Sequence, residues 1–86
     1  MTFKHYKGSE VTVTDWRGVF IEAGMVPAVV YLHDGLKFVR PLHDFLAIVT
    51  AGVPPGTRRF TPVDPAAERA FAEMVTMKEK HDVGCN

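Results

Sequence analysis

The chain has 86 residues, of which 47% are hydrophobic, and its ten Lys and Arg residues balance ten Asp and Glu residues. A chain of this length forms one domain with a thin core. A neutral composition without a Lys/Arg block excludes an extended nucleic-acid surface and a basic membrane-binding face, although a local basic cluster can still bind a phosphate.

The single cysteine, Cys85, lies second from the end of the sequence and excludes both a disulfide framework and a cysteine-based metal site. No apolar run approaches the ~18 residues that a membrane span needs. The first ten residues also lack the apolar core of a signal peptide. These features together predict a cytoplasmic protein that does not enter a membrane.

Short β-strands are predicted over most of the first sixty residues. The strongest signal is Asp34-Gly35 between two apolar runs, which is typical of a two-residue hairpin turn. This turn predicts that Tyr31 lies opposite Phe38 and that Val29 lies opposite Arg40. Because both faces of the hairpin are largely apolar, we expect it to be covered on both sides. The predicted strands are 11–14, 19–22, 28–33, 36–40 and 58–61, after an extended segment at 1–9.

Two helices are predicted in the second half of the chain. Apolar residues at helical spacing and Gly52 favour a short helix at 42–51, with a strand at 48–50 as the alternative. Asp64 as N-cap and Pro65 at the first position begin a longer helix, expected to end near Lys80 or His81. We therefore divide the chain into a β-rich module at 1–62, a helix at 63–82 and a frayed tail at 83–86.

The order of these elements indicates the α+β class. Strands without βαβ alternation predict a small antiparallel, SH3-like curled sheet or barrel, with a short helix and a C-terminal amphipathic helix. The long helix carries an apolar stripe that must be buried, either against the sheet or against a partner chain. Phe71, Met74 and Met77 are the candidate interface residues of this stripe.

An ordered set of short motifs resembles the small bacterial and phage family called DUF1653. The resemblance covers roughly residues 3–61 and implies a compact β-rich module with no assigned activity. Two positions depart from the usual family pattern, since Phe38 replaces a tryptophan and only Glu22 matches a polar run before the hairpin. The motifs are His5-Tyr6-Lys7-Gly8, Val11 and Val13, Val29-Val30-Tyr31, Phe38-Val39-Arg40-Pro41 with Phe45 and Val49, and Arg59-Phe60.

The main candidate site is a basic cluster with aromatic neighbours. Arginine offers a planar fork for phosphate or carboxylate, and lysine adds a point charge. Aromatic rings beside them can stack on a flat ligand. The alternative is structural, with Arg40 and Arg59 pairing with Glu22, Asp44 or Asp15 to hold strands together. The predicted ligand-binding residues are His5, Lys7, Glu22, Tyr31, Arg40 and Arg59.

Other chemistry has weaker support. The four histidines show no metal-ligand spacing, so neither a metal nor a cofactor is predicted. Ser9 and Cys85 lack the context of a catalytic nucleophile. We therefore expect a non-enzymatic binding module for an anionic or nucleotide-like small molecule or a peptide, acting as a phage or bacterial regulatory or anti-defence protein. The alternatives are an adaptor that forms a homodimer through its C-terminal helix and, last, a small hydrolase using Glu22 and His5.

Overall fold

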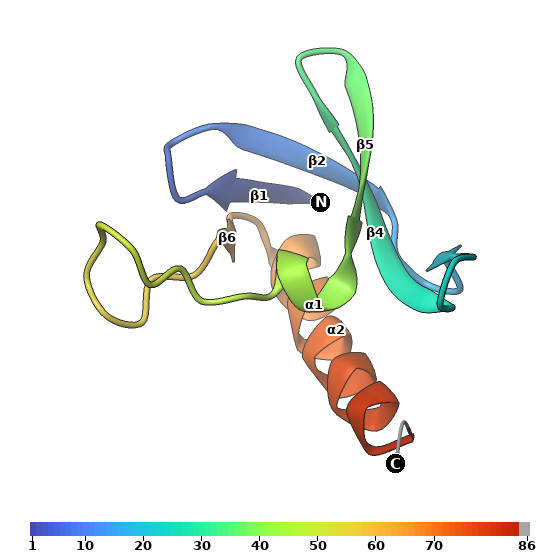
Figure 1. Cartoon of the computed structure of the whole chain (residues 1–86). Helices are drawn as coiled ribbons and strands as arrows, with labels where there is room; N and C mark the ends of the chain where they lie inside the picture. The colour runs from blue at the N-terminus through green and yellow to red at the C-terminus, as the bar shows by residue number, and fades with distance from the viewer. Residues whose placement is uncertain (85–86) are drawn as a thin grey trace.

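The computed structural model describes residues 1–84, with side chains described through Lys80, and it joins a curled sheet to one long helix (Figure 1). Cys85 and Asn86, the end of the predicted tail, lie outside the described residues. The elements are β1 (Thr2–His5), β2 (Glu10–Asp15), β3 (Phe20–Ile21), β4 (Val26–His33), β5 (Leu36–Pro41), α1 (Leu42–Phe45), β6 (Phe60–Pro62) and α2 (Pro65–Gly84).

The strands form one six-stranded sheet in which every described pairing is antiparallel. β4 pairs with β2, with β3 and with β5, while β1 pairs with β2 and with β6. No described pairing joins β5 to β6, so the described sheet is open. The prediction of a small α+β domain with an antiparallel sheet and a C-terminal helix is confirmed.

The β4–β5 hairpin has the predicted register, with Tyr31 opposite Phe38 and Val29 opposite Arg40. Asp34 and Gly35 both have positive φ angles, 52° and 75°, as a two-residue hairpin turn of type I′ requires. The expected cover on both sides is wrong, because Leu36 is 62% exposed on β5. β5 stands at one end of the sheet, where no described element packs on its outer face.

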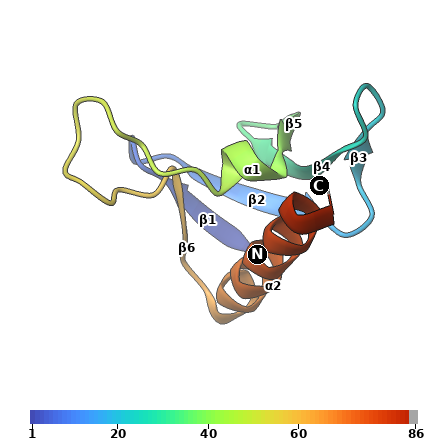
Figure 2. The ribbon, with the colours of Figure 1, turned by 60° about the horizontal axis from the view of Figure 1, so that its bottom comes forward.

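The core lies between the sheet and the two helices. Phe3, Phe45, Phe60 and Met74 are almost completely buried. The rings of Phe45 and Phe60 stack with centroids 4.3 Å apart, and Phe3 meets Phe45 edge-on at 5.2 Å. Figure 2 shows α2 crossing beside β1, where its buried face contributes to this cluster.

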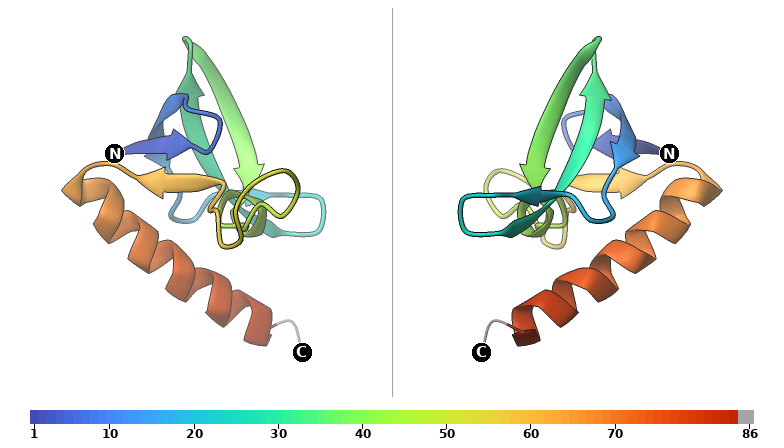
Figure 3. Two further views of the ribbon diagram at one scale, coloured as in Figure 1. Left: turned by 90° about the vertical axis from the view of Figure 1, so that its left-hand side faces the viewer. Right: turned by 90° about the vertical axis from the view of Figure 1, so that its right-hand side faces the viewer.

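α2 begins where the sequence predicts. The Asp64 carboxylate accepts hydrogen bonds from the Ala67 N–H (2.7 Å) and from the Thr2 N–H (3.0 Å), so it caps the helix and ties it to β1. The helix ends at Gly84, beyond the predicted end near His81. Figure 3 shows it leaving the end of β6 and running obliquely beneath the sheet.

The predicted helix at 42–51 is shorter than expected, because α1 ends at Phe45. The chain then becomes extended, and the Val49 N–H donates to the Thr57 carbonyl oxygen at 2.8 Å. Ile48 forms an isolated antiparallel bridge with Arg58. The β-branched residues at 48–50 therefore favour extended backbone over the helical spacing.

Candidate functional site

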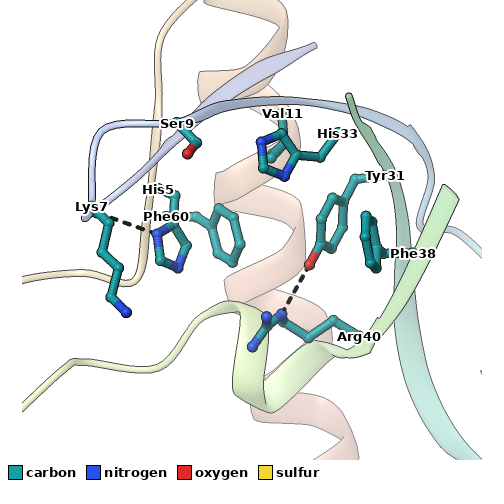
Figure 4. Close-up of a pocket in the computed structure, with 9 residues that line it drawn as sticks. All are labelled: His5, Lys7, Ser9, Val11, Tyr31, His33, Phe38, Arg40 and Phe60. Atoms are coloured by element: carbon teal, nitrogen blue, oxygen red, sulfur yellow. Dashed lines mark hydrogen bonds between the residues drawn. The ribbon is translucent and has the colours of Figure 1, made fainter. Parts of the chain in front are cut away.

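A cavity of about 300 Å³ opens between the β1–β2 turn and the β4–β5 hairpin (Figure 4). Its walls are the faces of aromatic rings, and nitrogen donors stand around its rim. The strand register brings these side chains together, because His5 pairs with Phe60 and Tyr31 pairs with Phe38. The lining residues are His5, Lys7, Ser9, Val11, Tyr31, His33, Phe38, Arg40 and Phe60.

Arg40 is the most firmly held cation of the cavity. Its Nε donates to the Tyr31 hydroxyl at 3.2 Å, and its Nη1 donates to Asp44 Oδ2 at 2.7 Å. Burial lowers the pKa of Arg40, but the bonds to Tyr31 and Asp44 outweigh it and leave the pKa raised. The guanidinium therefore stays charged, and within the described residues its Nη2 makes no hydrogen bond.

Arg59 lies behind this rim and does not line the cavity. Its Nη2 is 3.9 Å from Asp44 Oδ1, so one carboxylate faces two guanidinium groups. The Nε of Arg59 is buried and has no hydrogen-bond partner in the described part of the chain. The structural alternative is therefore correct in part: Asp44 pairs with both arginines, while Arg40 also lines the cavity.

His5 presents a neutral ring to the cavity. The backbone N–H of Lys7 donates to His5 Nδ1 at 3.2 Å, which places the proton of the neutral imidazole on Nε2. Burial lowers the pKa of His5, and the positive charges of Arg40, Arg59 and Lys7 lower it further. At neutral pH this ring is therefore a hydrogen-bond donor without a charge.

The aromatic walls extend from the core. Tyr31 stacks on Phe38 with centroids 5.7 Å apart and lies 5.6 Å from Phe60. Phe60 is buried, while Phe38 is 40% exposed. In Figure 4, the Tyr31 ring points its hydroxyl at Arg40, and His33 and Ser9 lie on the opposite side.

Glu22, another predicted site residue, is not brought to this cavity. It lies in the exposed turn that joins β3 to β4, whereas Tyr31 and His33 are at the other end of β4. The predicted site missed His33, Ser9 and Val11 as lining residues. Strand alternation provides a signal for His33, which is two residues from Tyr31 and shares its face.

The predicted interface residues pack within the chain. Met74 is 0% exposed, and Phe71 and Met77 are half-buried against the same core cluster. Phe71 lies 6.5 Å from Phe3, centroid to centroid. The apolar stripe of α2 is therefore largely buried against the core of its own chain.

Comparison with known proteins adds no family assignment: no family model, no curated protein and no solved structure matches this chain. Among the described residues, no group of three or more His, Cys, Asp or Glu residues could hold a metal ion. No described helix is long and apolar enough to cross a membrane. The cavity's own chemistry is thus the source of a functional interpretation.

Proposed function

We propose that this protein is a small non-enzymatic binding module that holds an anionic, nucleotide-like molecule in the cavity between the β1–β2 turn and the β4–β5 hairpin. The observation that carries this proposal is the meeting of Lys7, Arg40 and the Nε2–H of His5 with the rings of Tyr31 and Phe38.

The donors favour an anion with several acceptor oxygens. Arg40 has one end of its guanidinium available, and Lys7 is an exposed ammonium group. Charge-assisted hydrogen bonds to such groups are stronger than neutral ones. Asp44 already neutralises part of the local charge, so the net attraction comes mainly from Lys7 together with the arginine pair.

The aromatic walls favour a flat ring beside the anion. Rings that stack on a nucleobase contribute roughly 1–3 kcal/mol per base when measured by alanine substitution. Phe38 keeps 40% of its surface exposed although it is large and apolar. A bound base would cover this exposed surface of Phe38, which gives the site a preference for nucleotides over simple anions.

We further propose an SH3-like barrel, membership of the DUF1653 family and a cytoplasmic role. An SH3-like barrel is supported by the return of β6 to pair with β1 after the β1–β2–β4–β5 run of neighbours. Membership of the DUF1653 family rests on the ordered motifs alone. A cytoplasmic protein that sequesters a nucleotide-like signal, as a phage or bacterial regulator, is the cellular role that we infer from these features.

The test measures mononucleotide binding by the whole chain and by matched lysine variants. Isothermal titration with AMP, GMP and UMP should show binding that Lys7→Ala weakens about tenfold, since one direct charge contact is lost. Lys37→Ala removes the same charge from exposed β5 outside the cavity and should leave affinity unchanged. No binding of any mononucleotide, or equal affinity in the two variants, would overturn the proposal.

Native mass spectrometry of freshly purified protein supplies an independent readout. A mass excess that disappears on denaturation would identify a retained ligand. The same spectrum reports the number of subunits, which tests the alternative homodimer. Phe71→Glu should destabilise a monomer whose stripe is core, and it should instead dissociate a dimer whose stripe is an interface.

A further inference from the structure

A second cavity, of about 480 Å³, lies on the other side of the end of β1. Its charged lining residues, Lys4 and Arg58, are both basic. Tyr6 adds an aromatic ring, and Val63, which is 51% exposed, adds apolar surface. This cavity therefore repeats the combination of cations and apolar surface found in the first, and His5 is the one lining residue that both cavities share.

The two cavities are neighbours because His5 lines both of them. β1 is paired with β2 on one side and with β6 on the other, so no gap in the sheet joins the cavities. A ligand that occupies both cavities must therefore pass around the end of β1, where Tyr6 and Lys7 form the turn. The Tyr6 ring is 4.6 Å from the His5 ring, and Lys7 Nζ lies 5.8 Å from the Tyr6 centroid.

Charge is distributed unevenly over this route, although the whole chain is neutral. Lys4 and Arg58 stand on one side of the β1 end, and Lys7 and Arg40 stand on the other. No Asp or Glu lines either cavity. A ligand that follows this path meets cations on both sides of the strand end.

We propose that the ligand consists of two consecutive nucleotides joined by a phosphodiester, one in each cavity, with the backbone passing over Tyr6 and Lys7. This inference rests on the proposed function, since the first nucleotide occupies the first cavity. Lys4 and Arg58 contact the second nucleotide, and the Tyr6 ring stacks on or beside its base. Arg58 is held in place by the Phe71 ring, whose centroid is 4.8 Å from the guanidinium carbon.

The chemistry is shared by a free dinucleotide and by a segment of single-stranded RNA or DNA. The neutral charge of the chain favours the short ligand, because ten acidic residues balance the ten basic ones and leave no net positive charge to attract a long strand. Two probes distinguish these sources: linear pApA and an adenosine decamer. A free dinucleotide predicts that the decamer binds no more tightly than pApA.

The experiment compares AMP with pApA on the wild-type chain and on variants of Lys4, Arg58 and Lys37. We expect pApA to bind at least about tenfold more tightly than AMP, because its second nucleotide is linked to the first and makes contacts of its own in the second cavity. Lys4→Gln should remove most of this gain without changing AMP affinity. Arg58→Lys keeps the charge but removes the planar fork, and it should remove part of the gain. Lys37→Gln is the control and should change neither affinity.

The outcomes separate this inference from the function on which it rests. If AMP binds and depends on Lys7 but pApA binds no more tightly, the second cavity takes no nucleotide and only this inference fails. A gain that persists in both Lys4→Gln and Arg58→Lys also overturns it. If no mononucleotide binds at all, the proposed function itself fails, and the two-nucleotide ligand fails with it.

Discussion

The aromatic core of this protein has two ends with different surroundings. At the end beneath the sheet, Phe3 and Phe45 pack against α2, and Met74 completes the cover. At the other end, the ring contacts continue through Phe60 and Tyr31 to Phe38, where the cover is incomplete and Phe38 stays 40% exposed. Cations stand there.

The two ends differ in how far their rings are exposed and not in residue type. Phe45 is 0% exposed and Phe38 is 40% exposed, although both rings belong to one chain of aromatic contacts through Tyr31. A covered ring stabilises the fold by apolar burial. An uncovered ring beside a cation retains apolar surface that a ligand can bury.

The largest expected effect comes from removing a ring at each end of this contact chain. Phe45→Ala should reduce the free energy of unfolding by about 3–5 kcal/mol, since it leaves a cavity between Phe3 and Phe60. Phe38→Ala should cost about 1 kcal/mol, because it loses one stacked pair at an exposed site. Urea denaturation followed by tryptophan fluorescence measures both values.

For ligand affinity, we expect replacement of Phe38 to have a larger effect than replacement of Phe45, which is the opposite of their order for stability. Phe38→Ala should weaken AMP binding about tenfold, as the loss of one stacking partner for a base would. Phe45→Leu, which keeps an apolar side chain and so keeps the chain folded, should leave that affinity within about twofold. If Phe45→Leu weakens binding as much as Phe38→Ala does, the two ends are not functionally distinct.

An intermediate effect is expected from Asp44, the carboxylate that Arg40 and Arg59 share at the open end. Asp44→Asn should lower the free energy of unfolding by about 1 kcal/mol or less, because this ion pair is partly solvent-screened. AMP should bind several-fold more tightly, because a repulsive charge is gone and Arg40 gains a free donor. Asp15→Asn is an exposed control. Weaker AMP binding in Asp44→Asn would mean that Asp44 mainly positions Arg40.

The smallest expected effect is the pH dependence contributed by His5. Its pKa is lowered in the fold by burial and by nearby cations, so the unfolded chain binds a proton more readily. The contribution of His5 to stability is therefore present above the ordinary histidine pKa of about 6.5 and is lost as the pH falls through the lowered value.

A bound anion reverses this preference, because it favours the imidazolium form. Affinity for sulfate, whose charge is constant in this range, should rise about two- to fivefold between pH 7.5 and 5.5. His5→Gln should flatten this rise without removing binding, and titration calorimetry at each pH measures it. An equal rise in His5→Gln would assign the effect to another titratable group.

Much of the fold could be predicted from local signals. The Asp34-Gly35 turn specified the β4–β5 register residue by residue, because a two-residue turn leaves no freedom in the pairing. Asp64 and Pro65 specified the start of α2. The extent of α1 was predicted poorly, since the residues at 46–51 satisfy both helical spacing and β-propensity and only the pairing with 57–59 decides between them.

The candidate site could be predicted in part. His5, Lys7, Tyr31 and Arg40 meet in one cavity, because the curled sheet brings β1 and the turn after it close to β4 and β5. Glu22 was included because it matches a family position, and sequence gives no measure of its distance along β4. Arg59 does not line the cavity, and its Nη2 lies 3.9 Å from Asp44 Oδ1.

The amino-acid sequence by itself determined the strands, the hairpin register, the capped start of α2 and the residue types available for binding an anion, because these depend on contacts between near neighbours. Only the tertiary structure decided which end of the aromatic stack is covered and where Glu22 lies. It also decided that four of the ten basic residues, Lys4, Lys7, Arg40 and Arg58, line the two cavities at the end of β1. These outcomes depend on how strands from 2–5, 26–41 and 60–62 are brought together, and no local pattern encodes those distances.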